Sequence, residues 1–268
     1  MTTGALIFAF NNEHTDYVSM AAWSADRIRR HLDMPVAVVT DCTDPDQLTN
    51  FDRVISADPA SGGTRWFDDY QQTVTWYNAG RTDAYSVSPW DQTLVLDADY
   101  VVCGNELKVV IDSTQDFMCH RLAWDMIRGI DSFEGLNHFG QHKFPMWWAT
   151  VMMFRRSNTA QYIFESMTMI KNNWRHYKDL YHITGPQYRN DFALSIALGI
   201  VSGHTLRVDA IPWRLATVMP EHKLLQLGPD HFEIRYQDQA QIKRMNWKNM
   251  DFHAMGKKHL GDIIASTV

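Results

Sequence analysis

The sequence predicts an α/β fold in which helices flank a mixed, mainly parallel sheet. Residues 4–10 form a nearly unbroken apolar run that stops at Asn11 and Asn12, as expected of a strand buried on both faces. After a cap at Thr15 or Asp16, apolar residues recur at helical spacing. Strand and helix patterns then alternate, which is typical of βαβ units.

The remaining elements follow from the same patterns. In the first helix, Arg27, Arg29 and Arg30 fall largely on the face opposite the apolar residues. We expect strands over 35–40 and 53–56, one or two helices over 66–85, and a strand region over 93–102. Further along we expect strands over 116–120 and 150–154, a candidate substrate lid between them, a helix over 160–174 capped by Ser157 or Asn158, and a helix over 190–199 capped by Asn190.

Composition restricts the function classes. No repeat or linker divides the 268 residues, so we expect one domain with a nucleotide-binding half (1–104) and an acceptor-binding half (105–268). A net charge of -6 argues against a whole-surface nucleic-acid binder but leaves a local basic groove open. Cys42, Cys103 and Cys119 lack the close spacing of zinc or redox motifs. Without a signal-like N-terminus or an apolar run near ~20 residues, a cytoplasmic protein with no membrane partner is expected.

Two carboxylates interrupt an apolar segment. Asp97 and Asp99 lie within Leu-Val-Leu-Asp-Ala-Asp-Tyr-Val-Val, and strand alternation would put both on one face. Two such carboxylates would repel each other unless a cation neutralises them, and their hard oxygen atoms suit Mg²⁺ or Mn²⁺. The alternative is that they only cap a strand or a turn.

This segment resembles the Asp-x-Asp motif of GT-A fold glycosyltransferases, particularly the retaining family 8 group. The resemblance implies that Asp97 and Asp99, with Ala98 between them, link Mn²⁺ or Mg²⁺ to the diphosphate of a nucleotide-sugar donor, expected to be UDP-linked. The segment around His253 is similar to the closing motif of that family, in which a histidine completes the metal shell and a glycine and a lysine meet the diphosphate. Gly256 and Lys257 match these two positions, although Lys258 is an alternative and His259 stands where the family usually has its lysine.

Other candidate positions are less specific. The resemblance implies donor contacts from Asn78 and Arg81, and places Asp191 beneath the sugar as a candidate catalytic group. A solvated helix face for Arg81 and a helix N-terminus for Asp191 are sufficient alternatives. Polar and aromatic residues that follow the first two strands are expected to contact the base or the ribose: Phe10, Asn11, Asn12 and Asp41. Trp147 and Trp148 stand where the family has residues beside the sugar, or they belong to the core.

We therefore expect a metal-dependent glycosyltransferase. A nucleotidyltransferase and a catalytically silent nucleotide- or glycan-binding protein are the alternatives. The N-terminal stretch also resembles proteins of tailed bacteriophages, which suggests hydroxymethylated pyrimidines in DNA as the acceptor. Basic residues interleaved with Trp174, Tyr177 and Trp247 could form a groove for it or be solvated faces: Arg155, Arg156, Lys171, Arg175, Lys178, Lys243, Arg244 and Lys248.

Overall fold

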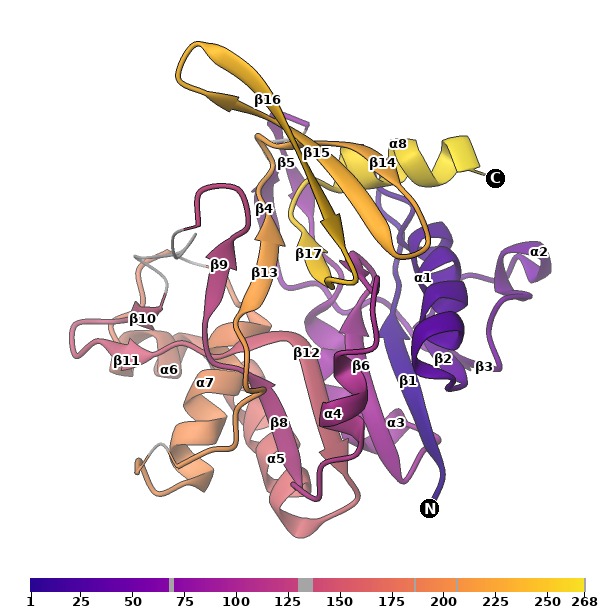
Figure 1. Cartoon of the computed structure of the whole chain (residues 1–268). Helices are drawn as coiled ribbons and strands as arrows, with labels where there is room; N and C mark the ends of the chain where they lie inside the picture. The colour runs from indigo at the N-terminus through magenta and orange to yellow at the C-terminus, as the bar shows by residue number, and fades with distance from the viewer. Residues whose placement is uncertain (68–69, 130–136, 186, 206, 268) are drawn as a thin grey trace.

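A mixed sheet forms the centre of the molecule. The computed structural model describes residues 1–67, 70–129, 137–185, 187–205 and 207–267. The central strands are β1 (Thr3–Phe8), β2 (Val36–Thr40), β3 (Arg53–Ser56), β6 (Gln92–Asp97), β8 (Phe117–His120) and β12 (Trp148–Arg155). In the order β3-β2-β1-β6-β12-β8, the first four are parallel and β12 is antiparallel to both of its neighbours. The expected α/β fold with a mixed, mainly parallel sheet is confirmed (Figure 1).

Helices cover this sheet. They are α1 (Tyr17–Leu32), α2 (Pro45–Leu48), the 3-10 helix η1 (Ala79–Asp83), α3 (Ala84–Val87), α4 (Leu107–Ile111), α5 (Asn158–Asn172), α6 (Trp174–Leu180), α7 (Asn190–Val201) and α8 (Lys257–Thr267). Helix α1 packs against β1 and β2, and α7 packs against β12 and α5. Asp16 and Ser157 cap α1 and α5 as predicted, by accepting hydrogen bonds from Ser19 and Ala160. None of the helices in the described ranges is both long enough and apolar enough to cross a bilayer.

Smaller sheets complete the fold. A four-stranded sheet has the order β7 (Tyr100–Val101), β17 (Phe252–Ala254), β13 (Leu215–Val218) and β9 (Ala123–Asp125), and a three-stranded sheet comprises β14 (Lys223–Leu227), β15 (His231–Asp238) and β16 (Gln241–Lys248). Two hairpins are β4 (Thr64–Phe67) with β5 (Gln72–Thr75), and β10 (His138–Phe139) with β11 (Phe144–Pro145). In the four-stranded sheet His253 pairs with Tyr100 on one side and Thr217 on the other.

The predicted helix over 66–85 is wrong in its first part. The segment begins with the β4–β5 hairpin, and only residues 79–87 are helical. Its β-branched residues favour a strand, and Gln71 has a φ of 51°, a left-handed conformation that turns the chain between the strands. The predicted lid between β8 and β12 contains β9, β10 and β11, and its residues 130–136 lie outside the described part of the chain.

Arg27 is buried, although it was expected largely on the helix face opposite the apolar residues. Its guanidinium donates hydrogen bonds to the carbonyls of Val102 (2.6 Å), Gly228 (2.9 Å) and Pro229 (2.8 Å), and Trp23 lies against it. Burial lowers the pKa of Arg27 from its ordinary value. Helical periodicity identifies only the face that meets the central sheet, whereas a second layer of structure covers the arginine from the other side.

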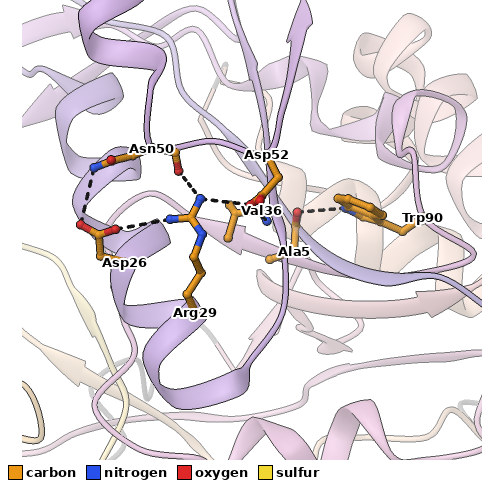
Figure 2. Close-up of polar contacts among 7 residues, drawn as sticks. All are labelled: Ala5, Asp26, Arg29, Val36, Asn50, Asp52 and Trp90. Carbon is orange, nitrogen blue, oxygen red and sulfur yellow. Dashed lines mark hydrogen bonds and ion pairs between the residues drawn. The ribbon is translucent and has the colours of Figure 1, made fainter.

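Arg29 fixes the position of α1 at the edge of the sheet. Figure 2 shows its guanidinium between the Asn50 carbonyl (2.5 Å) and the Asp52 carboxylate (3.0 Å), with Asp26 on the same helix nearby. Asp52 also accepts a hydrogen bond from the Val36 amide (2.8 Å). Burial acts to raise the pKa of Asp52, but the hydrogen bonds from Val36 and Arg29 outweigh it and hold the pKa below its usual value. The helix and the start of β2 are thereby held in register.

We predict that His120 makes the fold less stable in acid. Burial lowers its pKa from 6.5 to about 4, so between these values the unfolded chain binds more protons than the native one. The free energy of unfolding should therefore fall as the pH decreases through this window, by about 2 kcal/mol between pH 7 and pH 5 from this group.

Urea denaturation at both pH values would measure this contribution. His120→Gln should lose it, whereas His142→Gln, at an exposed position, should keep it. An identical pH dependence in wild type and His120→Gln would contradict the prediction.

Candidate functional site

A cavity of about 330 Å³ opens at the carboxyl ends of β1 and β6, where open α/β sheets bind ligands. Phe8 and Asp97, the last residues of these strands, are paired in parallel register. Residues from the first strand, the Asp-x-Asp segment, the start of α7 and the closing motif meet here. The predicted residues among its lining are Phe10, Asn12, Asn78, Arg81, Asp97, Ala98, Asp99, Asp191, His253 and Lys257.

The two aspartates lie in different backbone elements. Asp97 ends β6, whereas Asp99 lies in the turn that leads into β7. Simple strand alternation is therefore not the reason that both carboxylates face the cavity. The backbone carbonyl of Asp99 accepts a hydrogen bond from the Ala254 amide (3.0 Å), which brings the turn against β17 and places His253 beside it.

Fixed cations accompany both carboxylates. Arg81, whose side chain is 4% exposed, forms an ion pair with Asp97, and Lys257 forms one with Asp99. Burial lowers the pKa of Arg81 to about 10, so it stays protonated at neutral pH. Burial acts to raise the pKa of Asp99, but the neighbouring Lys257 and His253 outweigh it and hold the pKa well below its usual range. Arg81 is thus not on a solvated helix face.

Asp97, Asp99 and His253 fit a divalent cation. One ligand atom from each lies within 4.8 Å of the others, and Nε2 of His253 is 3.3 Å from Oδ1 of Asp99. Two carboxylate oxygens and one imidazole nitrogen form a donor set that suits Mn²⁺, and the oxygens also suit Mg²⁺. The arrangement requires two movements, because a cation bound by both carboxylates has to displace the amino group of Lys257 from Asp99 and the guanidinium of Arg81 from Asp97.

Asp191 and Arg81 bind the two backbone polar groups of Ala149. Oδ1 of Asp191 accepts from the Ala149 amide (3.0 Å), and Arg81 donates to the Ala149 carbonyl (2.9 Å). Arg189 donates to Oδ2 of Asp191 (2.8 Å). Asp191 therefore has a clear structural role while it also lines the cavity. The prediction that Asn190 caps α7 is wrong: the N-cap residue is Arg189, and the side-chain Nδ2 of Asn190 donates to the Asn78 carbonyl (2.9 Å).

Three predicted donor contacts do not line the cavity. Asn11 accepts a hydrogen bond from the Val18 amide (2.9 Å) at the start of α1, Asp41 is exposed beyond β2, and Gly256 is buried between two lining residues. Asn12 lines the cavity but is also occupied locally, because its carboxamide oxygen accepts from the amides of His14 and Thr15. Location after a strand end was not sufficient to identify a contact residue.

Aromatic residues that the sequence did not single out form much of the wall. They are Tyr17, Trp66, Phe67, Trp76 and Tyr77, and they join Trp148, which the sequence did single out. Four of them come from the β4–β5 hairpin and the residues directly after it, next to Asn78. The sequence signal for this wall was the cluster of aromatic residues between 66 and 77. The predicted helix would have pointed these side chains in different directions, so the cluster was not identified as one surface. Trp148 is buried, so the core and the cavity alternatives for this residue both hold.

No family model and no curated protein sequence matches this chain. Its structure is similar to an active-site mutant of the galactosyltransferase LgtC, with a TM-score of 0.50, 14% identity, and coverage of 72% of this chain and 69% of that chain. A complex of LgtC with donor and acceptor sugar analogues gives a TM-score of 0.49, 11% identity, and coverage of 73% and 70%. Mouse xyloside xylosyltransferase 1 gives 0.43, 13% identity, and coverage of 76% and 83%. At 14% identity the similarity to the LgtC mutant establishes the fold alone, which is that of a GT-A glycosyltransferase.

Proposed function

We propose that the protein is a metal-dependent glycosyltransferase that uses a nucleotide-sugar donor, UDP-linked as in the retaining family 8 group. The observation that carries the proposal is the convergence of Asp97, Asp99 and His253 in one cavity at the strand ends, with Arg81 and Lys257 beside them. The shared fold with LgtC supports a donor of this class. The acceptor would be a hydroxyl group.

The charges of the site favour joint binding of metal and diphosphate. Three carboxylates, on Asp97, Asp99 and Asp191, already face three cations, on Arg81, Lys257 and Arg189. A divalent cation alone would break two of these ion pairs and leave excess positive charge. A diphosphate that arrives with the metal can accept the released lysine and arginine, so each ligand should raise the affinity for the other.

Each group then has a defined task. The metal would stabilise the negative charge that develops on the leaving nucleoside diphosphate. Lys257 would neutralise the same charge, and the aromatic wall would hold the base or the sugar. Asp191, fixed by Ala149 and Arg189, would orient the sugar at the reacting centre. A nucleotidyltransferase is disfavoured because residues 10–13 are Phe-Asn-Asn-Glu where a glycine-rich loop is typical. Slow hydrolysis of the donor would show that the protein is an enzyme and not a catalytically silent binding protein.

Removing a metal ligand should abolish cooperative binding of UDP and Mn²⁺. We expect Asp99→Asn to weaken Mn²⁺-dependent UDP binding by at least about 100-fold, and His253→Ala to weaken it less, because a carboxylate contributes charge as well as a ligand atom. Asp97→Asn should also lower the unfolding free energy, because Arg81 loses its partner. Isothermal titration calorimetry with and without Mn²⁺ measures the binding. Unchanged UDP affinity in folded Asp99→Asn protein would refute the metal assignment.

Lys257→Met should affect the binding of Mn²⁺ and the binding of UDP in different ways. Without the amino group, Asp99 becomes available, so Mn²⁺ alone should bind at least as tightly as to wild type, while UDP in saturating Mn²⁺ should bind roughly tenfold more weakly. Lys258→Met is the matched control, because Lys258 pairs with Asp262 on the surface. If Lys258→Met showed the larger loss of UDP affinity, the assignment of Lys257 would be overturned.

We also propose that the acceptor is a hydroxymethylated pyrimidine in phage DNA, which is modified in the host cytoplasm. The basic residues expected to form its groove do not come together. Arg155 lies at the end of β12 that pairs with Gln92, away from Asp97, and Figure 1 places β16 far from α5. On β16, Lys243, Arg244 and Lys248 form ion pairs with acidic side chains.

A different surface supports an anionic acceptor. A second cavity, of about 820 Å³, shares Trp66 and Arg189 with the first one. His138, Lys143 and His182 line it, and its described lining contains no Asp or Glu. The side chains of Lys143 and Arg189 and the exposed Trp66, beside the proposed donor site, suit phosphate groups and an unstacked base.

We predict sugar transfer to DNA that contains hydroxymethylcytosine, in the presence of Mn²⁺ and a nucleotide sugar. Mass analysis of the nucleosides should show an added hexose or pentose, and Lys143→Glu should raise the KM for DNA while it leaves donor hydrolysis unchanged. Lys178→Glu, on α6, is the charge-matched control. Transfer to a small glycan or a protein, with none to DNA, would refute this acceptor and leave the transferase proposal intact.

A further inference from the structure

A separate cavity of about 520 Å³ lies behind the four-stranded sheet. Tyr100 and Asp251 line it, and no residue of its described lining also lines the first cavity. The two cavities are therefore separate. The volume is within the range of small-molecule sites, roughly 300–1,000 Å³.

The floor of this cavity contains an imidazole acceptor. The Nδ1 atom of His120 is 3.1 Å from the Trp213 carbonyl, which can only accept, so Nδ1 carries the hydrogen. At neutral pH the ring is uncharged, because burial lowers the pKa of His120 to about 4. Nε2 is therefore an acceptor, and it is buried without a hydrogen-bond partner. A buried acceptor of this kind costs free energy until a donor reaches it.

Asp251 provides a second acceptor. Its Oδ1 atom accepts from the amides of Cys103 (2.7 Å) and Gly104 (2.8 Å), while its Oδ2 atom is buried without a partner. Glu106 is a further carboxyl group in the lining. Arg214 also lines the cavity, so its lining has two carboxyl groups against one guanidinium. Together with the imidazole acceptor, this set favours a ligand that donates several hydrogens.

The walls are aromatic. Trp213 and Trp124 both line the cavity, and both are only partly buried. Trp124 is in contact with other rings and cations, since Arg214 lies over its ring (5.4 Å) and Trp247 meets it edge-on. Trp213 contacts His120 edge to face (6.4 Å) and is the better platform for a ring that carries apolar C–H groups on one side.

We propose that this cavity is a second carbohydrate-binding site, which holds a neutral sugar ring against Trp213 with its hydroxyl groups directed to His120 and Asp251. A ring with C–H groups on its face and hydroxyl donors at its edge matches both the wall and the floor. The site is separate from the metal cavity, so this inference does not depend on the proposed transferase activity. In a transferase it would hold a sugar that does not react.

The test uses saturation-transfer NMR with methyl glucoside, methyl galactoside and methyl xyloside, which cannot act as donors, on the full chain without nucleotide. At least one sugar should bind saturably. Trp213→Ala should weaken its binding at least roughly tenfold. Trp66→Ala, at the exposed tryptophan of the first cavity, should leave the binding unchanged, as should Asp99→Asn.

Val109→Trp provides a variant with little risk to folding. Val109 lines the cavity but is 62% exposed on α4, so a larger side chain there should block the site without disturbing the core. Val109→Ser is the control that should still bind. The proposal is overturned if no sugar binds, if Val109→Trp binds as tightly as Val109→Ser, or if Trp66→Ala loses binding while Trp213→Ala retains it.

Discussion

The turn at Ala98 and Asp99 is the constraint on which the site depends. It ends the central strand β6 and starts β7, which belongs to a different sheet. Through the hydrogen bond from Ala254 to the Asp99 carbonyl, the turn attaches the C-terminal part of the chain to the end of the central strands. This hydrogen bond and the pairing of β17 with β7 bring His253 and Lys257 to Asp99. If the turn moved, the two halves of the site would separate.

The negative charges that this turn places in the site are balanced in the absence of ligands. Asp97 and Asp99 point into a cavity with apolar and aromatic walls, where unpaired carboxylates would be costly. Arg81 and Lys257 supply the positive charges that pair with them, and they come from two other elements, η1 and α8. These pairs stabilise the protein before any donor binds, and they are also the contacts that a metal and a diphosphate would exchange. Stability and ligand affinity therefore oppose each other at these four residues.

The sequence predicted the parts that local patterns encode. Apolar runs ended by polar residues identified β1, β2 and β6, and caps at Asp16 and Ser157 identified two helices. The position of the two aspartates after a buried strand was enough to locate the cavity. His253 could be placed beside them only through the resemblance to a family, because nothing in its own neighbourhood distinguishes it from the other histidines.

The remaining features depend on contacts between distant segments. Each strand of the β4–β5 hairpin is stabilised by pairing with the other. Because this pairing is not visible in the spacing of the apolar residues, the segment was predicted as a helix. The burial of Arg27 depends on carbonyls at Val102, Gly228 and Pro229, which come from other layers of the fold. His120 and Asp251 are far apart in sequence and become two acceptors of one cavity only after folding.

The proposed function depends on Asp97, Asp99 and His253 binding one divalent cation. The most direct measurement is anomalous X-ray scattering at the manganese edge from crystals grown with Mn²⁺ and UDP. The account predicts a peak within coordination distance of all three side chains, with Arg81 and Lys257 turned towards the diphosphate. Within the described part of the chain, Asp125, Glu221 and His222 form the other group that could hold a cation. A manganese peak there, or UDP in the first cavity with no manganese beside it, would contradict the account.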